Sequence, residues 1–169
     1  MVNCLLLLTL WGGLVAQRLG ELRLSKSHTQ SLLARGAREY GAGHYPVMVM
    51  FHTSWFLCWL WEAWRTGCLL NPLWRWLLMA AVVCQMVRLA TMRALGERWT
   101  TRVLVVPGTS PVRSGIYRWL PHPNYLAVAV EIACVPLIFW AWRTALLFTL
   151  GNLVLLKTRV RVENEALEL

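Results

Sequence analysis

The chain has 169 residues, enough for one domain, and is 57% hydrophobic and only 15% charged, with a mean hydropathy of +0.48. A soluble domain would carry roughly a quarter charged residues, so this composition excludes an ordinary globular protein and indicates a polytopic helical membrane protein. The net charge of +9 comes without an RNA- or DNA-binding motif, and we expect no nucleic-acid partner, because lysine and arginine accumulate in cytoplasmic loops of membrane proteins.

The first apolar run, residues 2–17, follows Met1 without a basic segment or an A-x-A cleavage site. We therefore expect a retained first span, extended through Leu19 and Leu22, and no cleaved signal. The polar segment 18–43 that follows predicts a helix lying on the membrane surface.

Two further spans are predicted at residues 44–64 and 71–92, the second beginning at an Asn71-Pro72 pair. His52 lies within the first of these spans. An ionisable group at membrane depth is a candidate functional residue, here a substrate contact, although a neutral histidine that is hydrogen-bonded to a neighbouring helix is the favoured interpretation.

The third polar segment, residues 94–118, includes an extended stretch at 103–106 and ends before two more apolar runs. These runs, at 125–142 and 144–156, are joined by a very short connection, which predicts a tight antiparallel hairpin. The tail, 157–169, is helical by composition. The predicted fold is therefore all-α, with about five transmembrane helices, a C-terminal helical hairpin and a cytoplasmic tail helix.

Basic residues are distributed unevenly over this five-span arrangement. Fourteen of the seventeen lysines and arginines fall on the side of the tail, and Arg65, Arg75 and Arg143 fall on the other. The positive-inside rule therefore predicts an outside N-terminus and a cytoplasmic tail, and the expected location is the inner (plasma) membrane.

The five cysteines form no C-x-x-C pair, and most fall inside apolar runs. We expect small buried side chains, and neither disulfides nor metal ligands. The cysteines are Cys4, Cys58, Cys68, Cys84 and Cys134.

The stretch 114–125 contains a histidine between two prolines, followed at once by an amide and a phenol. Pro121 and Pro123 fix φ and remove two backbone donors, so they predict a rigid polar corner. His122, Asn124 and Tyr125 would then lie at the mouth of the next helix, whose apolar run carries one acid, Glu131. The alternative is an interfacial turn with an anchoring tyrosine.

The tail offers a second polar set, because Arg159 and Glu163 are four residues apart and share one helical face. The tight hairpin would bring both toward His122 and Tyr125. Such a site suits a polar cofactor on the water side and a lipid-like substrate from the bilayer. The alternative is a surface ion pair of little consequence.

These motifs resemble the isoprenylcysteine carboxyl methyltransferase family in its short bacterial form, over nearly the whole chain. The family pattern G-x-Y-R-W-x-R-H-P-N-Y corresponds to Gly115-Ile-Tyr-Arg-Trp-Leu-Pro-His-Pro-Asn-Tyr125. The pattern R-x-x-x-E-E-x-x-L corresponds to Arg159-Val-Arg-Val-Glu-Asn-Glu-Ala-Leu167. Two positions depart from the family pattern, since Pro121 replaces an arginine and Asn164 an acid.

The resemblance implies S-adenosylmethionine as the methyl donor. Arg159 would hold the acceptor carboxylate, and Arg159 and Glu163 would form the catalytic pair. The loop 109–112 would close over the cofactor. The implied cofactor contacts are Ser110, Val112, Tyr117, His122, Pro123, Asn124, Tyr125 and Glu163.

The expected function is methylation of a carboxylate, or an acidic hydroxyl, on a lipophilic, prenylcysteine-like substrate, by one membrane domain over 1–169 with its catalytic part at 94–169. A carboxylate is already ionised at pH 7, so the transfer needs alignment and desolvation but no general base. Two alternatives stay open: an NADPH-dependent enzyme similar to sterol reductases, which share R-H-P-x-Y, and a non-catalytic membrane scaffold. The sequence leaves the acceptor and the oligomeric state open.

Overall fold

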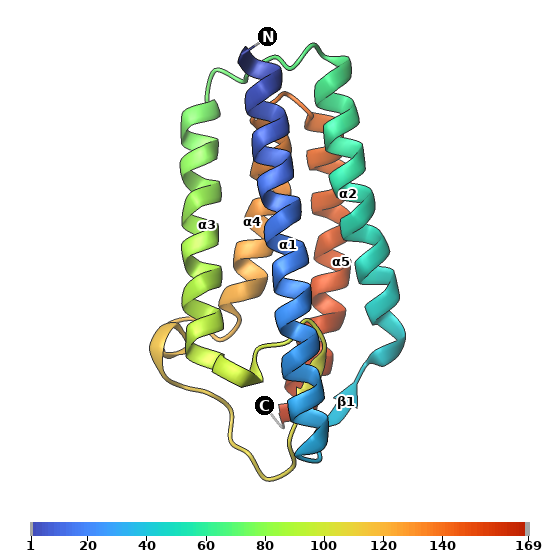
Figure 1. Ribbon diagram of the computed structural model, residues 1–169, viewed down its shortest axis with the longest axis vertical. Helices are drawn as coiled ribbons and strands as arrows, with labels where there is room; N and C mark the ends of the chain where they lie inside the picture. Colours follow the sequence, from blue (N-terminus) through green and yellow to red (C-terminus); the bar gives the residue numbers. More distant parts are fainter. Residues whose placement is uncertain (1, 168–169) are drawn as a thin grey trace.

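The computed structural model describes residues 2–167, and within this range five long helices run up and down beside one another (Figure 1). The all-α prediction is confirmed, and the fold is that of a helical membrane protein. The helices are α1 (Val2–Ala34), α2 (Tyr45–Arg65), α3 (Trp74–Leu95), α4 (Pro123–Leu137) and α5 (Trp142–Leu167). Short 3₁₀ turns, η1 (Ala42–His44), η2 (Gly96–Arg98) and η3 (Gly115–Arg118), lie in the two long connections.

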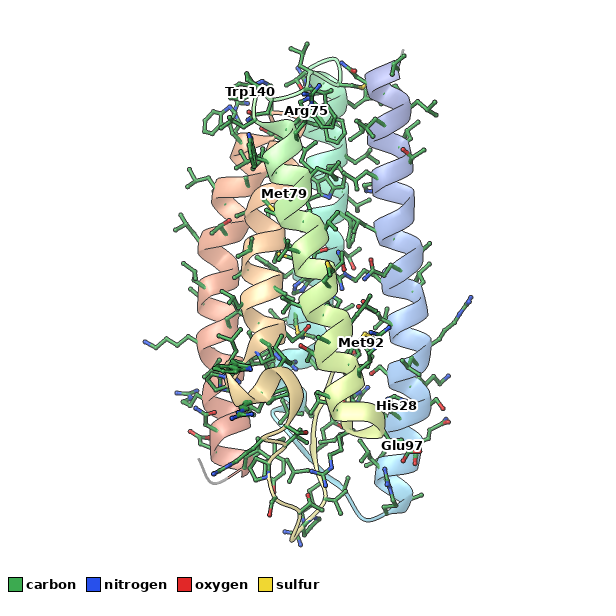
Figure 2. The ribbon with its side chains drawn as sticks, turned by 90° about the vertical axis from the view of Figure 1, so that its left-hand side faces the viewer. His28, Arg75, Met79, Met92, Glu97 and Trp140 are labelled. Carbon is green, nitrogen blue, oxygen red and sulfur yellow. A yellow bond between two sulfur atoms is a disulfide. The ribbon has the colours of Figure 1, made fainter. Side chains whose placement is uncertain are left out.

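Two segments are long and apolar enough to cross a membrane by hydropathy, namely Val2–Ala34 and Trp74–Arg98. Large apolar side chains nevertheless cover the outside of all five helices, as expected for a bundle in lipid. Arg75 and Trp140 lie at one end of this bundle, and His28 and Glu97 at the other (Figure 2). The count of five spans stays a prediction.

The first helix differs from the sequence-based expectation. Residues 18–34 continue α1 without a break and do not form a separate helix on the membrane surface. The segment contains no proline, and its polar residues Arg18 and Glu21 find partners inside the bundle, so nothing interrupts the helix. Helix α1 ends at Ala34, and Gly36 just beyond it adopts the left-handed conformation that commonly terminates a helix.

The predicted boundaries of α2 and α3 are confirmed to within three residues, whereas α4 ends at Leu137, before the predicted end at 142, and α5 continues into the predicted tail without a break. The α4–α5 hairpin turns at residues 138–141, and α4 begins at Pro123, two residues earlier than expected. The carboxylate of Glu62 in α2 accepts hydrogen bonds from the backbone N–H groups of Arg143 and Thr144, so it caps the start of α5. The two C-terminal helices are therefore fixed at the turn and pack along their length.

The extended stretch predicted at 103–106 is confirmed as strand β2 (Val103–Val105). It pairs antiparallel with β1 (Arg38–Tyr40), with Tyr40 opposite Val103. This two-stranded sheet joins the α1–α2 and α3–α4 connections, which are far apart in sequence. It therefore brings residues 99–101 against the end of α1 and the side of α5.

The cysteine prediction is wrong at Cys4 and Cys68, which form a disulfide, and it is wrong about burial at Cys58. Cys4, in the first turn of α1, forms a disulfide with Cys68 in the α2–α3 connection, because this connection folds back over the start of α1. Cys58 is exposed, whereas Cys84 and Cys134 are buried free thiols as expected. The disulfide lies at the end of the bundle opposite the C-terminus (Figure 1).

Candidate active site

The histidine corner connects η3 to α4. Pro123 occupies the first turn of α4, where its missing N–H costs no hydrogen bond, and His122 precedes it as the N-cap residue. The backbone N–H of Tyr125 donates to the carbonyl of His122, and the two rings stack with centroids 5.5 Å apart. The prolines thus hold the imidazole and the phenol as one rigid unit.

The end of α5 returns to this corner, as the hairpin predicted. The Tyr125 hydroxyl donates to Glu163 Oε2 at 2.5 Å, and His122 Nδ1 lies 3.7 Å from the same oxygen. His122 Nε2 is 3.1 Å from Asn164 Oδ1, and since an amide oxygen only accepts, Nε2 carries the proton. Asn164, one of the departures from the family pattern, therefore orients the imidazole.

Arg159 makes no surface ion pair with Glu163, so that alternative is wrong. Its side chain is buried, with only 7% of the residue exposed. Nη1 donates to the carbonyl oxygen of Thr101 at 3.1 Å and lies 3.3 Å from Met48 Sδ, while Nε lies 3.4 Å from the Tyr125 hydroxyl. Across residues 2–167, no carboxylate lies within ion-pair distance of this guanidinium.

A cavity of about 540 Å³ opens at the corner, among η2, β2, the loop 106–113, η3 and the end of α5. Arg98 Nη1 donates to the carbonyl oxygen of Ser110 at 2.8 Å and ties this loop to η2. Of the predicted cofactor contacts, Pro123 lies outside the lining, because it is buried in the first turn of α4, and the predicted substrate contact His52 does not line this cavity either. The predicted residues that line the cavity are Ser110, Val112, Tyr117, His122, Asn124, Tyr125, Arg159 and Glu163.

The polar groups of this cavity suit a ligand with both donors and charges. Asn124 Oδ1 is buried without a hydrogen-bond partner in the described chain, so an acceptor is left over at the cavity wall. Burial, and secondarily the charge of Glu163, raise the pKa of the Tyr117 phenol, which therefore stays protonated at neutral pH.

A second cavity of about 430 Å³ lies beneath α1, among α1, α2, α4 and α5. Its walls are mostly apolar and include Trp11, Trp55 and Ile132. His52 also lines it, but its Nδ1 is bonded to the carbonyl of Met48 in its own helix and not to a neighbouring helix. The residues shared by both cavities are Trp99, Thr100, Asn124, Tyr125 and Arg159.

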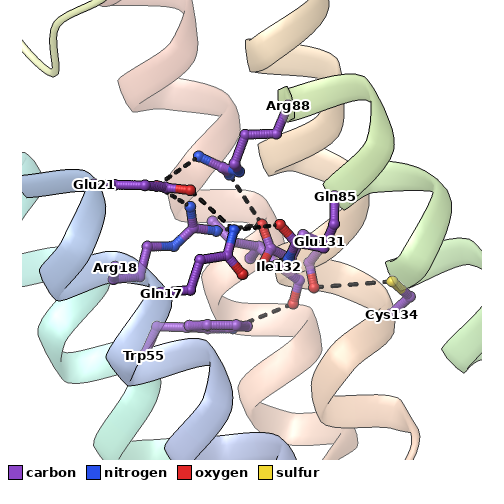
Figure 3. A network of polar contacts seen from close by, with 9 residues as sticks. All are labelled: Gln17, Arg18, Glu21, Trp55, Gln85, Arg88, Glu131, Ile132 and Cys134. Atoms are coloured by element: carbon purple, nitrogen blue, oxygen red, sulfur yellow. Dashed lines mark hydrogen bonds and ion pairs between the residues drawn. The ribbon is translucent and has the colours of Figure 1, made fainter. Parts of the chain in front are cut away.

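A network of buried charges lies beside the second cavity at mid-bundle (Figure 3). Glu131 of α4 accepts from Arg18 of α1 at 2.5 Å and from Arg88 of α3 at 3.0 Å. Both arginines also contact Glu21, at 2.7 and 3.3 Å. We call these four residues, Arg18, Glu21, Arg88 and Glu131, the charge network; Gln17 and Gln85 extend it with further hydrogen bonds.

Sequence reasoning missed the second cavity, the pairing within the charge network, and Asn152, which also lines that cavity. A signal for the network was present, because Arg18 and Glu21, Gln85 and Arg88, and Glu131 are polar residues in or beside apolar runs. Such residues usually pair with one another inside a bundle. Placing residues 18–43 on the membrane surface removed half of the network from consideration.

Comparison with known proteins places this geometry in a family. A model of the isoprenylcysteine carboxyl methyltransferase (ICMT) family matches residues 76–169, which include the corner, the hairpin and the tail. The chain belongs to this family. ICMT membership bears out the resemblance in the motifs and indicates a membrane methyltransferase.

Two relatives extend the similarity over most of the chain. The Bacillus subtilis (strain 168) "Uncharacterized protein YpbQ" is 39% identical over 159 residues, covering 92% of each chain. An "Uncharacterized protein" from Haemophilus influenzae (strain ATCC 51907 / DSM 11121 / KW20 / Rd) is 25% identical over 155 residues, covering 91% of this chain and 90% of its own. No solved structure matches the chain.

Proposed function

We propose that this ICMT-family protein is an S-adenosylmethionine-dependent methyltransferase that methylates a carboxylate, or an acidic hydroxyl, of a lipophilic, prenylcysteine-like molecule. The observation that carries the proposal is the place of Arg159. It is a buried arginine without a carboxylate partner in the described chain, and it lies where the polar and the apolar cavity meet. An uncompensated cation at such a place favours an anionic group brought in by the substrate.

The cavity at the histidine corner fits the proposed cofactor. Its volume lies in the usual range for small-molecule sites. Glu163 and Asn124 Oδ1 offer acceptors for an ammonium group and ribose hydroxyls, and Arg113 of the loop and Arg118 of η3 offer donors for a carboxylate. When bound, S-adenosylmethionine supplies an electrophilic methyl group on a sulfonium, a cation that suits the aromatic face of Tyr117, because the Tyr125 ring already stacks with His122 and lies beneath the Arg159 guanidinium.

The acceptor would enter the cavity beneath α1 with its ionised oxygen at Arg159. A bound S-adenosylmethionine would supply the methyl group for this oxygen, with Glu163 and Asn124 holding the donor and Arg159 holding the acceptor. No proton moves, so the site needs no general base. Arg159, which is held in position by Thr101 and Tyr125, would orient the acceptor oxygen and replace its hydrating water in a buried site.

Two independent features support a cytoplasmic active site. Most basic residues lie in the connections and the tail at the corner's end of the bundle. The Cys4–Cys68 disulfide lies at the opposite end, and disulfides persist in oxidising compartments such as the periplasm. We expect a reporter fused after Leu169 to be active in the cytoplasm of a bacterium; a reporter active only in the periplasm would reverse the orientation.

The function is tested with purified protein in nanodiscs, labelled S-adenosylmethionine and S-farnesylcysteine analogues or long-chain acids as acceptors. We expect a base-labile methyl ester, and saturable binding of the cofactor in the absence of acceptor. Binding of NADPH in place of S-adenosylmethionine would overturn the proposal in favour of a reductase. If the protein binds neither S-adenosylmethionine nor NADPH, the alternative of a non-catalytic membrane scaffold is favoured.

A further inference from the structure

Asn152 of α5 is a polar residue without an evident structural task. It is only 1% exposed and lines the apolar cavity beneath α1, and its Oδ1 has no hydrogen-bond partner among residues 2–167. Burying such an acceptor unpaired is costly, and more so in a helix surrounded by lipid. Because Asn152 lines this cavity, a molecule bound there would lie beside its amide group.

The depth of Asn152 is set by its distance from Arg159. The two residues are seven positions apart on α5, which places them on the same face and separates them by about 10 Å along the helix axis. On the antiparallel α4, Glu131 follows Tyr125 by six positions and lies roughly 9 Å above the corner. Asn152 and the charge network therefore line the second cavity at a similar depth, and we call these residues together the polar belt.

The belt contains both a hydrogen-bond donor and a hydrogen-bond acceptor that lack a partner. Arg88 Nε, like Asn152 Oδ1, is buried without a partner within the described residues. The four charges of the network cancel in pairs, so the belt offers no net charge to a further ion. A neutral group that both donates and accepts suits it, and a hydroxyl has these properties.

We propose that the acceptor of this enzyme carries a hydroxyl on its apolar chain, about 10 Å from the methylated group, and that this hydroxyl donates a hydrogen bond to Asn152. The proposal rests on the proposed function for the position of the methylated group at Arg159. It makes Asn152 a residue that determines specificity, and it separates the acceptor from a purely hydrocarbon prenyl or acyl chain.

The test uses octadecanoic acid and its 2-, 10- and 17-hydroxy derivatives as probes, with the protein in nanodiscs. Equilibrium binding and methyl transfer are measured for each acid. We expect the wild-type protein to bind the 10-hydroxy acid about fivefold more tightly than octadecanoic acid, the effect of one added hydrogen bond. The 2- and 17-hydroxy acids should gain nothing, since their hydroxyls lie away from the belt.

Variants of α5 assign the preference to one side chain. Asn152→Leu keeps the branching at Cγ but removes the amide, and it should abolish the preference for the 10-hydroxy acid. The control is Leu153→Ala, a change on the lipid-exposed face that should keep the preference. If Asn152→Leu fails to fold, the comparison of hydroxyl positions on the wild-type protein decides alone.

The outcomes separate the two proposals. Equal binding of all four acids, or a preference that survives in Asn152→Leu, overturns the hydroxyl assignment while methyl transfer to octadecanoic acid would keep the proposed function. Preferential binding of the 10-hydroxy acid without any methylation would support the hydroxyl assignment and overturn the proposed function. Binding of none of the acids overturns the hydroxyl assignment.

Discussion

The bundle contains two places where arginines are buried, and they are organised in opposite ways. In the charge network, Arg18 and Arg88 each contact both Glu21 and Glu131, so two cations meet two anions. At the histidine corner, Arg159 contacts a carbonyl, a phenol and a thioether but no acid in the described chain. The nearby Glu163 is engaged by Tyr125 instead.

This difference distinguishes structural from functional charge. A buried cation that is paired with carboxylates holds helices together, and removing one carboxylate leaves a charge uncompensated. A buried cation held only by neutral groups keeps its position and its orientation, but its charge stays available. Under the proposed function, the second arrangement is the place for an anionic substrate. Variants at the two places should therefore fail in different assays.

The largest effect is expected at the charge network. Glu131→Gln removes one of two anions and leaves Arg18 and Arg88 to share Glu21. We expect it to lower the free energy of unfolding by about 3–5 kcal/mol, measured by denaturant unfolding in detergent. Glu97→Gln is the matched control, because the Arg35–Glu97 pair is equally short, 3.0 Å, but exposed. It should cost less than about 1 kcal/mol, and equal losses in both variants would end the distinction.

Arg159→Lys tests the other side of the comparison. The charge is retained but the planar fork of donors is lost. We expect turnover to fall about a hundredfold and the KM for the acceptor to rise, the cost of losing an oriented charge in a buried site. Cofactor affinity and unfolding should stay near wild type. Arg161→Lys, two residues away and exposed, is the control that should change neither. A loss of unfolding free energy as large as that of Glu131→Gln would show that Arg159 has a structural role.

Glu163→Gln asks whether the acid beside Arg159 serves the cofactor. An amide is a weaker acceptor than a carboxylate for the Tyr125 hydroxyl and for an ammonium or ribose group. We expect the Kd for S-adenosylmethionine to rise about tenfold, roughly the difference between charged and neutral hydrogen bonds. Titration calorimetry measures it, with the exposed Glu165→Gln as control. An acceptor KM that changes while the cofactor Kd does not would exchange the roles of the two residues.

The smallest effect is expected from Asn164→Leu. It removes the hydrogen bond that orients His122, but leaves the ring stacked on Tyr125. The cofactor Kd should rise about fivefold, as for one neutral hydrogen bond. Direct binding again provides the measurement. An unchanged Kd would mean that the two prolines alone fix the imidazole.

The sequence was most informative where the constraint is local. Two prolines around His122 and the four-residue spacing of Arg159 and Glu163 determine backbone and face directly, and a short connection forces the hairpin. The corner and its convergence with the tail followed from these features. The strand at 103–105 was likewise readable from its residues.

Features that depend on distant segments were not predictable in this way. The disulfide requires the α2–α3 connection to fold over Cys4, and the charge network requires three helices to pack at one depth. Thr101 reaches Arg159 because β1 and β2 pair across two connections. No residue pattern in one segment encodes such meetings, because the partners are chosen by packing.

The unbroken helix α1 has a mechanical consequence. Its 33 residues extend over roughly 50 Å, about 20 Å more than a bilayer's hydrocarbon core. The projecting turns carry Ser25, which bonds to Thr101, the residue whose carbonyl holds Arg159. We expect a change in the tilt of this continuous helix, as in a thinner or thicker bilayer, to move Ser25 and with it the Thr101 carbonyl that holds Arg159.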